Sequence, residues 1–568
     1  MRKTGYYIAI IVSMLLMSSC ENLLEPRKDN RLTEEEVLGN PEFAEGILLN
    51  AYIALADSYS PSSDEATDNA ATNSLGSGFL RMATGEWKST YNPLSAWNYA
   101  YNQIYYINLF LENYEDVEWS WRNEDVHEYY LQRFKGEAHG LRAMYEFELL
   151  KAHAGISVDN QLLGYPIVEE SLTKDDEFKL PRDTYQECVN HILADCDIAI
   201  QNLPPRYEDT EDFVYNEVFG SSFVNRMNGY AAMALRSRVT LHAASPAFTE
   251  SLSAADIQAR WEAAASSAGE LLDQAGGLAA VSPTGLRFYL SEITNYDPDI
   301  IWHTTHESNR SFENANYPPS LFGNGNTNPS QNLVDAFPMQ NGYPISDVAN
   351  SGYDPANPYV GRDPRLAEYI IYNGSILRGT PIFTASGLTK DGINASTEST
   401  RTGYYVKKFV NPKVNLNPIS PNDANHFYTY FRFTEVFLNY AEAANEAWGP
   451  DGDPMGYGFT SKDVIGAIRE RAGIAQPDNY LAGISTIEEM RTLIHNERRL
   501  ELCFEESRFW DIRRWKYALT EPVKGVFISG TSYDYQTVEN RDYLPHMIYG
   551  PIPYNETLLY DLKQNQGW

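Results

Sequence analysis

The sequence predicts an all-α protein built from paired helices, with long loop-rich excursions between some of them. Apolar residues recur at helical spacing in residues 93–113, 124–154, 185–203, 226–244, 254–275, 427–448, 461–472 and 487–504. Several of these segments are rich in small residues, as in Tyr230-Ala-Ala-Met-Ala234, which lets neighbouring helices pack closely. Successive helices of this kind favour a tetratricopeptide-like solenoid, although no regular repeat of about 34 residues is present.

The chain opens with the features of a secretory signal peptide. Two basic residues, Arg2 and Lys3, precede an apolar run at 6–17 and the small residues before Cys20. The run is about a dozen residues long, whereas a bilayer-spanning helix needs roughly 20. A cysteine at the break is typical of a bacterial lipoprotein signal, although Met17 stands where that pattern prefers Leu. We predict that residues 1–19 are removed, that Cys20 carries a lipid anchor, and that residues 20–40 form its linker. The alternative is an ordinary secreted protein with a stray thiol.

The next elements follow from turn and capping residues. Residues 57–92 contain many Ser, Asn, Thr and Gly with scattered rings, which predicts a loop before the helix at 93–113. Asp183 offers a capping box for the helix that ends before Pro204-Pro205. Residues 300–302 (Ile-Ile-Trp) indicate a strand. The long stretch 295–403 is rich in Pro, Asn, Gly and Tyr; loops of this length are functional or disordered, and the rings argue against disorder.

Composition excludes some classes of partner. The formal net charge of −33 disfavours nucleic acid, which requires clustered Lys and Arg, and it disfavours docking on anionic lipid. The chain is too long for one hydrophobic core, so two or more lobes or a solenoid are expected. Cys188 and Cys196 lie eight residues apart on one predicted helix, about 12 Å in rise and too far for a disulfide. We expect these two thiols and Cys503 to be buried.

A search for catalytic motifs finds none that is specific. His303-Thr-Thr-His306-Glu307 matches neither arrangement of a zinc-protease helix. Gly85-Glu-Trp-Lys-Ser89 lacks the glycine that precedes the lysine of a phosphate loop. Asp451-Gly-Asp453 lacks the twelve-residue calcium loop, so a structural calcium ion stays only an open possibility. We therefore predict no catalytic residue, no metal site and no cofactor, while a glycoside hydrolase is left open because paired carboxylates have no sequence signature.

Several segments, in this order, resemble the SusD/RagB family of surface lipoproteins from Bacteroidetes. They read GEAHGLRA at 136–143, GYP at 342–344, RDPRL at 362–366, FRFTEVFLNYAEA at 431–443, IGAIRERAG at 465–473, ERRLELCFEESRFWDIRRW at 497–515, and PIP at 551–553 before the terminal QNQGW. On a helix Glu497 and Glu501 share one face with Arg498 near both, while Leu500 and Phe504 can face the core. We predict that the segment at 497–515, the signature segment of this resemblance, locks helices together and does not bind ligand.

The resemblance implies a fold and a function. Members of the family have about four tetratricopeptide-like helix pairs with loop-rich excursions over them, so we expect a helical region at 41–290 with a binding loop at 57–92. The second region, 291–568, would contain the excursion 295–403 and the last helices. The resemblance implies a non-catalytic protein that binds oligosaccharides at the cell surface. It would act as the lid of a SusC-like TonB-dependent transporter, anchored by lipid in the outer membrane and facing outward. The alternatives are binding of peptides or another nutrient by the same lid mechanism and, less favoured, a surface glycoside hydrolase.

Ligand residues are carried over from the family by region only. In the first loop we predict Trp87 and Tyr91 as stacking platforms and Asn73 as an amide partner. In the excursion we predict stacking by two rings and hydrogen bonding by two polar side chains, namely Tyr317, Phe322, Asn309 and Arg310. The alternative for each ring is that it packs within its own loop.

Overall fold

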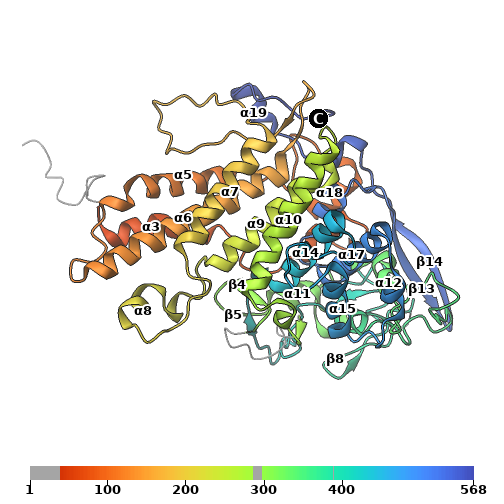
Figure 1. Ribbon diagram of the computed structural model, residues 1–568. Helices are drawn as coiled ribbons and strands as arrows, with labels where there is room; N and C mark the ends of the chain where they lie inside the picture. The colour runs from red at the N-terminus through yellow and green to blue at the C-terminus, as the bar shows by residue number, and fades with distance from the viewer. Residues whose placement is uncertain (1–38, 286–296, 388) are drawn as a thin grey trace, which may run out of the picture.

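Helices that pack side by side in chain order form the scaffold of the computed structural model, which describes residues 39–285, 297–387 and 389–568 (Figure 1). The scaffold helices are α3 (Pro41–Ile53), α5 (Trp97–Asn113), α6 (Glu124–His153), α7 (Tyr185–Asn202), α9 (Gly229–Ala244), α10 (Ala254–Gln274), α14 (Phe433–Trp448), α15 (Ser461–Ala472) and α17 (Ile487–Glu501). They pack as the successive pairs α3/α5, α6/α7, α9/α10 and α14/α17, and α10 contacts α14 across the excursion that separates them in sequence. The predicted all-α architecture of paired helices is confirmed.

Short strands brace the loops. Within the described ranges every strand belongs to a two-stranded antiparallel ladder. The ladders are β1 (Ala70–Thr72) with β6 (Thr327–Pro329), β2 (Gly155–Ile156) with β3 (Leu162–Leu163), β4 (Ile300–His303) with β12 (Thr429–Arg432), β5 (Glu307–Asn309) with β11 (Ala424–His426), β7 (Ile370–Ile371) with β10 (Tyr405–Val406), β8 (Ile376–Leu377) with β9 (Thr380–Pro381), and β13 (Val523–Ser529) with β14 (Ser532–Glu539). The strand predicted at 300–302 is confirmed as β4. Its partner β12 takes residues that the helical pattern assigned to the start of α14, so that helix begins later than predicted.

Short helices connect these ladders to the scaffold. They are α4 (Gly78–Arg81), α8 (Phe213–Phe219), α11 (Ser311–Asn316), α12 (Gln331–Ala336), α13 (Pro364–Tyr369), α16 (Asn479–Gly483), α18 (Arg508–Arg514) and α19 (Tyr554–Leu559). The β1–β6 ladder joins the first loop to the excursion, with Ala71 opposite Asn328. Two regions that the sequence predicts to bind ligand, far apart in the chain, are therefore held together by backbone hydrogen bonds.

Capping of α7 differs from the prediction by one residue. The Thr184 hydroxyl accepts a hydrogen bond from the amide of Glu187, whose carboxylate accepts one from the Thr184 amide at 2.9 Å. The predicted cap, Asp183, instead accepts a hydrogen bond at 2.8 Å from the amide of Ile167. The prediction was wrong here because Asp183 is engaged by the incoming loop, which leaves the capping position to Thr184.

Glycines let α6 approach its neighbours. A methyl group at Gly136 would lie 2.6 Å from Cγ of Leu203, at the end of α7. One at Gly140 would lie 2.8 Å from Cε of Met227. Both distances are shorter than van der Waals contact, so the Gly-x-x-x-Gly spacing on one face of α6 is required by close packing and not by backbone conformation.

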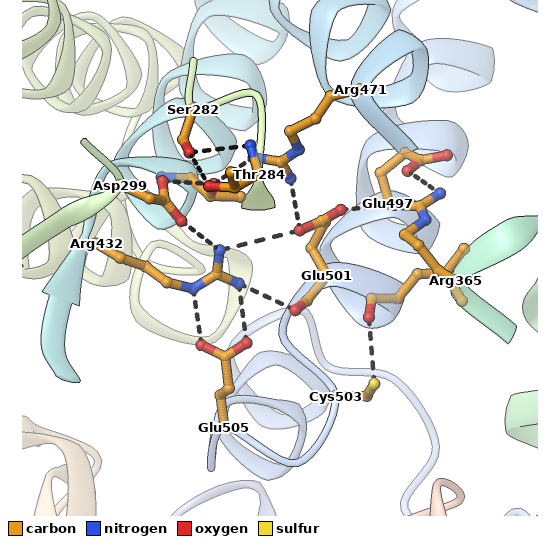
Figure 2. Close-up of polar contacts among 12 residues, drawn as sticks. Ser282, Thr284, Asp299, Arg365, Arg432, Arg471, Glu497, Glu501, Cys503 and Glu505 are labelled. Carbon is orange, nitrogen blue, oxygen red and sulfur yellow. Dashed lines mark hydrogen bonds and ion pairs between the residues drawn. The ribbon is translucent and has the colours of Figure 1, made fainter. Parts of the chain in front are cut away.

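A buried network of charges joins the excursion to the last helices (Figure 2). Glu501 of α17 pairs with Arg365 of α13 at 2.9 Å and with Arg471 of α15 at 2.7 Å. Arg365 also pairs with Glu497 at 2.9 Å, and all four side chains are at least nine-tenths buried. These pairs satisfy charges that would otherwise be too costly to bury. The prediction that this motif locks helices together is confirmed.

One detail of that prediction is wrong. Arg498 does not serve Glu497 and Glu501; its guanidinium turns to Asp511 of α18, at 2.8 Å. The acids on the shared face instead receive arginines from other elements of the chain. Leu500 and Phe504 are buried, as predicted. Helical spacing identified the faces correctly but did not indicate which distant cations meet them.

The three cysteines beyond the signal segment, Cys188, Cys196 and Cys503, are free and buried, as predicted. Among the helices of the described ranges, none has both the length and the apolar character needed to span a membrane. The predicted signal peptide, the lipidation site Cys20 and nearly all of the linker lie outside the described residues.

Candidate functional site

A cavity of about 560 Å³ lies between the scaffold, the first loop and the signature segment near the C-terminus. Its walls come from the end of α3 and the loop after it, α4, the start of α5, one face of α6, α9, β12 and the turn before α18. This volume lies in the range of sites that hold small ligands. Met144, Glu148 and Lys151 line it together because residues three and four apart share a face of α6.

Aromatic rings supply much of the wall. Tyr99, in the first turn of α5, is 42% exposed and meets the ring of Tyr145, with ring centres 6.4 Å apart. Tyr428 and Tyr430 meet edge to face at 5.3 Å, and Trp510 of α18 lies under the ammonium of Lys151 at 4.7 Å. Partly exposed rings on a rigid scaffold offer flat apolar faces with polar tips, which is the surface that a sugar ring stacks on.

Most of the charges in the wall are paired. Arg238 holds Glu435 with two hydrogen bonds of 2.8 and 2.7 Å, and Lys151 holds Glu148 at 2.7 Å. Burial alone would raise the pKa of Glu435, but Arg238 overrides this effect and holds the pKa below its usual value. Burial, followed by the field of nearby arginines, lowers the pKa of His242 well below its ordinary value, so this imidazole is neutral at physiological pH.

Glu506 is the exception among the acids of the wall. Its backbone is in the left-handed region, with φ of 61°, which an L-residue with a side chain adopts only at some energetic cost. Burial raises its pKa to about 7; Lys151 opposes the rise, while Glu148 and Asp64 add to it. This carboxyl is therefore harder to ionise than an exposed glutamate, and a cation placed beside it would favour its charged form.

Two of the predicted ligand residues, Trp87 and Tyr317, are buried in the core. Trp87 is only 2% exposed and is enclosed by Phe509, Tyr543 and Trp568, while its indole N–H donates to Asn92 at 3.0 Å. Tyr317 is fully buried, and its hydroxyl donates to the backbone carbonyls of Asn411 and Val414. Because a sugar cannot stack on a ring whose faces are covered by protein, the assignment of both as platforms is corrected: they pack the fold.

The other predicted residues lie near or at the surface. Asn73 donates to the carbonyl of Asn324 at 2.8 Å, so it ties the first loop to the excursion close to Phe322, which is 51% exposed. Lys390 lies 5.2 Å from the centre of the Phe322 ring. Tyr91 lies under the guanidinium of Arg81, at 4.4 Å. None of these residues lines the cavity, so their predicted contacts with ligand remain a proposal.

The remaining two predicted residues are the last residue of strand β5, Asn309, and the residue that follows it, Arg310. The Asn309 side chain accepts a hydrogen bond at 3.0 Å from the amide of Ser311 and so shapes the turn into α11. Arg310 is partly exposed and lies 3.6 Å from Asp423. Sequence analysis did not predict the cavity rings Tyr99, Tyr428 and Tyr430; the alternation of aromatic residues before α14 was the signal that could have indicated them.

Two places in the described part of the chain have the types of side chain that bind cations. In the described part of the chain, Glu146, His191 and Asp195 are close enough to share a metal ion. However, Arg142 already holds both oxygens of Asp195, at 2.7 and 2.8 Å, and His191 hydrogen bonds Glu146 at 2.7 Å. These contacts describe an ion-paired clamp between α6 and α7.

The Asp453 loop is the second such group. The carboxylate of Asp453 accepts hydrogen bonds from the amides of Gly456 and Tyr457 at 3.0 Å and from the amide of Gly458 at 2.8 Å. Its oxygens therefore already organise the loop that follows α14.

Comparison with known proteins gives two matching family models. One, described as "SusD family", matches residues 298–568, and the other, described as "Starch-binding associating with outer membrane", matches residues 24–241. The chain is similar to SusD-like protein P38 of Formosa agariphila, with 22% identity over 540 residues, 91% of this chain and 92% of the relative.

Solved structures share the fold. A SusD-like protein of Bacteroides fragilis superposes with a TM-score of 0.74 at 23% identity, covering 94% of this chain and 99% of the other. A SusD-like carbohydrate binding protein of the same species superposes with a TM-score of 0.72 at 21% identity, covering 92% and 98%.

Proposed function

We propose that this chain, which belongs to the SusD/RagB family, binds oligosaccharides in the cavity described above without cleaving them. The observation that carries the proposal is the position of partly exposed rings and polar groups around a cavity of about 560 Å³, on the helical scaffold of a family described as starch-binding. A relative of known structure is named a carbohydrate binding protein, which supports the same class of ligand. In this proposal Tyr99, Tyr428 and Trp510 stack on sugar rings, and the polar tips and neighbouring acids bind hydroxyl groups.

The predicted surface residues fit this proposal as an outer subsite. Asn73 donates to the carbonyl of Asn324, two residues after Phe322, so both lie where two loops meet. Tyr91 packs near Gly78 and Pro93, and Pro93 is part of the cavity wall. A chain of several sugars that fills the cavity would reach beyond it, and exposed rings such as Phe322 would contact its outer units. Asn309 and Arg310 would hydrogen bond to that outer portion.

The second part of the proposal concerns location and partner. We propose that Cys20 carries lipid, that residues 20–40 tether the protein to the outer face of the outer membrane, and that the protein is the lid of a SusC-like TonB-dependent transporter. The description of the matching family as associating with the outer membrane supports this location. Cys20→Ala should move the protein from the membrane fraction to the soluble fraction. Retention of the variant in detergent-free membranes after a high-salt wash would contradict lipid anchoring.

The binding proposal is tested with the protein lacking residues 1–20 and a panel of polysaccharides and oligosaccharides, by calorimetry. Tyr99→Ala should weaken binding about tenfold, equivalent to ~1.4 kcal/mol, because it removes one stacking face. Tyr105→Ala is the matched control, because Tyr105 is a partly exposed ring on the same helix but outside the cavity wall. Unchanged affinity in both Tyr99→Ala and Tyr428→Ala would exclude this cavity as the site.

Two alternatives have their own outcomes. Release of new reducing ends from a bound polysaccharide by the pure protein would show a hydrolase. Binding of peptides, with no binding of any sugar in the panel, would show a peptide receptor built on the same scaffold.

A further inference from the structure

We propose that the cavity selects oligosaccharides that carry a primary ammonium group, as in an unacetylated amino sugar, and that Glu506 receives this group. The inference rests on the proposed function and goes beyond it by naming the chemistry that separates one class of sugar from another. It stands on four observations: the pairing of the charges in the cavity wall, the backbone that presents Glu506, the charges around it, and the rings around it.

The first observation is which acids already have a cation. Among the described residues, the other carboxylates of the wall form ion pairs: Glu148 with Lys151 at 2.7 Å, Glu435 with Arg238 at 2.7 Å, Glu505 with Arg432 at 2.8 Å, and Asp511 with Arg498 at 2.8 Å. Glu506 has no ion pair within 4.0 Å in the described part of the chain. It is thus the acid in the wall that is left for a cation from outside.

The second observation is the way the chain places this carboxyl. Phe504 and Glu506 both have left-handed φ values, of 64° and 61°, so the chain turns sharply between α17 and α18. Phe504 is fully buried, and Glu505 is held by Lys408 at 2.7 Å and by Arg432. These neighbours fix the turn, and the turn presents Glu506 to the cavity. Backbone strain of this kind persists where the surroundings enforce it and is concentrated at functional sites.

The third observation is the electrostatic environment. The charges that act on Glu506 are those of Lys151, Glu148 and Asp64. Lys151 is already paired with Glu148 at 2.7 Å, so the ionised form of Glu506 has no cation of its own, and an incoming ammonium would favour that form. An incoming ammonium would be attracted and an incoming carboxylate or sulfate repelled.

Aromatic faces around Glu506 add to this preference. Tyr99, Tyr428 and Trp510 line the same cavity, and Trp510 already accepts a cation on its face, the ammonium of Lys151 at 4.7 Å. Rings of this kind can hold the C–H face of a sugar while its ammonium reaches the carboxyl. A peptide could also supply an ammonium, but the arrangement of several rings about one acid favours a pyranose with an amine on the ring.

The test compares three tetrasaccharides by calorimetry at one pH: the β-1,4 glucosamine tetramer, its fully N-acetylated form, and a glucose tetramer. The wild type should bind the glucosamine tetramer at least tenfold more tightly than the N-acetylated form, and Glu506→Gln should remove that difference. Loss of a charge-assisted hydrogen bond in a cavity corresponds to roughly 10- to 100-fold in affinity. Glu217→Gln, at an exposed position of α8 away from the cavity, makes the same change in net charge and should preserve the selectivity.

A further variant protects the test against a folding defect. Glu506→Asp keeps the carboxyl and should retain at least part of the preference, while thermal unfolding shows whether each variant is folded. Equal affinity of the wild type for the glucosamine and N-acetylated tetramers overturns the inference. If the wild type shows no preference but still binds the N-acetylated or glucose tetramer, the selectivity inference fails and the proposed function survives. If no sugar in the panel binds, the proposed function fails together with the inference. Tighter binding of trilysine than of the glucosamine tetramer overturns the assignment to an amino sugar.

Discussion

Glu501 offers the sharpest test of the idea that the signature motif stabilises the fold. Glu501→Gln keeps the volume of the side chain and removes its charge. Arg365 would retain Asp363 at 2.6 Å and Glu497 at 2.9 Å. Arg432 would retain Glu505 at 2.8 Å and Asp299 at 3.1 Å. These two guanidinium groups therefore stay paired in the variant.

Arg471 would not stay paired. Its ion partner among the described residues is Glu501, at 2.7 Å, and its side chain is only 7% exposed. The substitution therefore leaves one buried guanidinium without an anion, beside the neutral Gln oxygen and the hydroxyl of Thr434, at 2.7 Å. Breaking a buried ion pair in this way costs about 3–5 kcal/mol, because the remaining charge keeps its desolvation penalty and loses its compensation.

The assay is equilibrium urea unfolding, followed by tryptophan fluorescence, of the protein without residues 1–20. Glu501→Gln should lower the free energy of unfolding by about 3–5 kcal/mol. Glu86→Gln is the control: it removes the same charge from a pair with Arg81 in which both side chains are about half exposed, and it should leave the midpoint unchanged. The reasoning is refuted if Glu501→Gln costs less than about 1 kcal/mol, because the charges would then be tolerated without pairing.

Three other predictions concern packing and pH. Trp87→Ala should destabilise the fold by about 3–5 kcal/mol because it removes a buried indole, and binding should survive in the fraction that stays folded; an unchanged melting temperature would contradict this. Gly136→Ala should destabilise by about 1–3 kcal/mol through its clash with Leu203. Gly46→Ala, in the open interior of α3, should stabilise by about 0.5–1 kcal/mol, and urea unfolding of both variants checks the opposite signs. Burial opposes the charging of His191, but Glu146 overrides it and raises the pKa of His191 from 6.5 to about 9. Its contribution to stability should therefore be complete below about pH 6.5 and lost as the pH rises through 9. The free energy of unfolding of His191→Gln should consequently be lower than that of the wild type at pH 6 and approach it at pH 10. A difference in this free energy that does not vary with pH would contradict the prediction.

Helices were predictable from the sequence because their information is local. The spacing of apolar residues gave α15 at its observed limits and α6 within one residue. Strand β12 was missed because its ladder depends on β4, which lies over a hundred residues away in the chain. The local pattern of apolar residues does not indicate a strand partner that is so distant in sequence. The capping residue of α7 was missed for the same reason, since the alternative cap, Asp183, is engaged by a loop.

Candidate ligand residues were less predictable. Trp87 and a cavity residue such as Tyr99 look alike in sequence, as rings within or beside a polar loop. Their exposure differs because Trp87 meets the C-terminal residue Trp568 and Phe509 of the signature segment, while Tyr99 lines the cavity and meets the ring of Tyr145. Whether an aromatic ring is buried in the core or exposed at the surface thus depends on contacts that form only when distant parts of the chain come together.

Adjacent residues of the signature motif have different surroundings, which changes how that motif should be interpreted. Glu505 also lines the cavity, but it is paired with Arg432 and Lys408 and so belongs to the buried network. Glu506, the next residue, lines the cavity from a left-handed turn and has no ion pair among the described residues, and Trp510 of α18 lines the cavity four residues later. A motif that locks helices therefore also forms one wall of the candidate site, and the proposed function departs here from the expectation that this motif does not bind ligand. Because the network fixes the backbone of the wall, substitutions within it, such as Glu501→Gln, should alter ligand affinity as well as stability. Substitutions at exposed rings such as Tyr99 should alter affinity alone, and this separation distinguishes a site built on the scaffold from one carried only by loops.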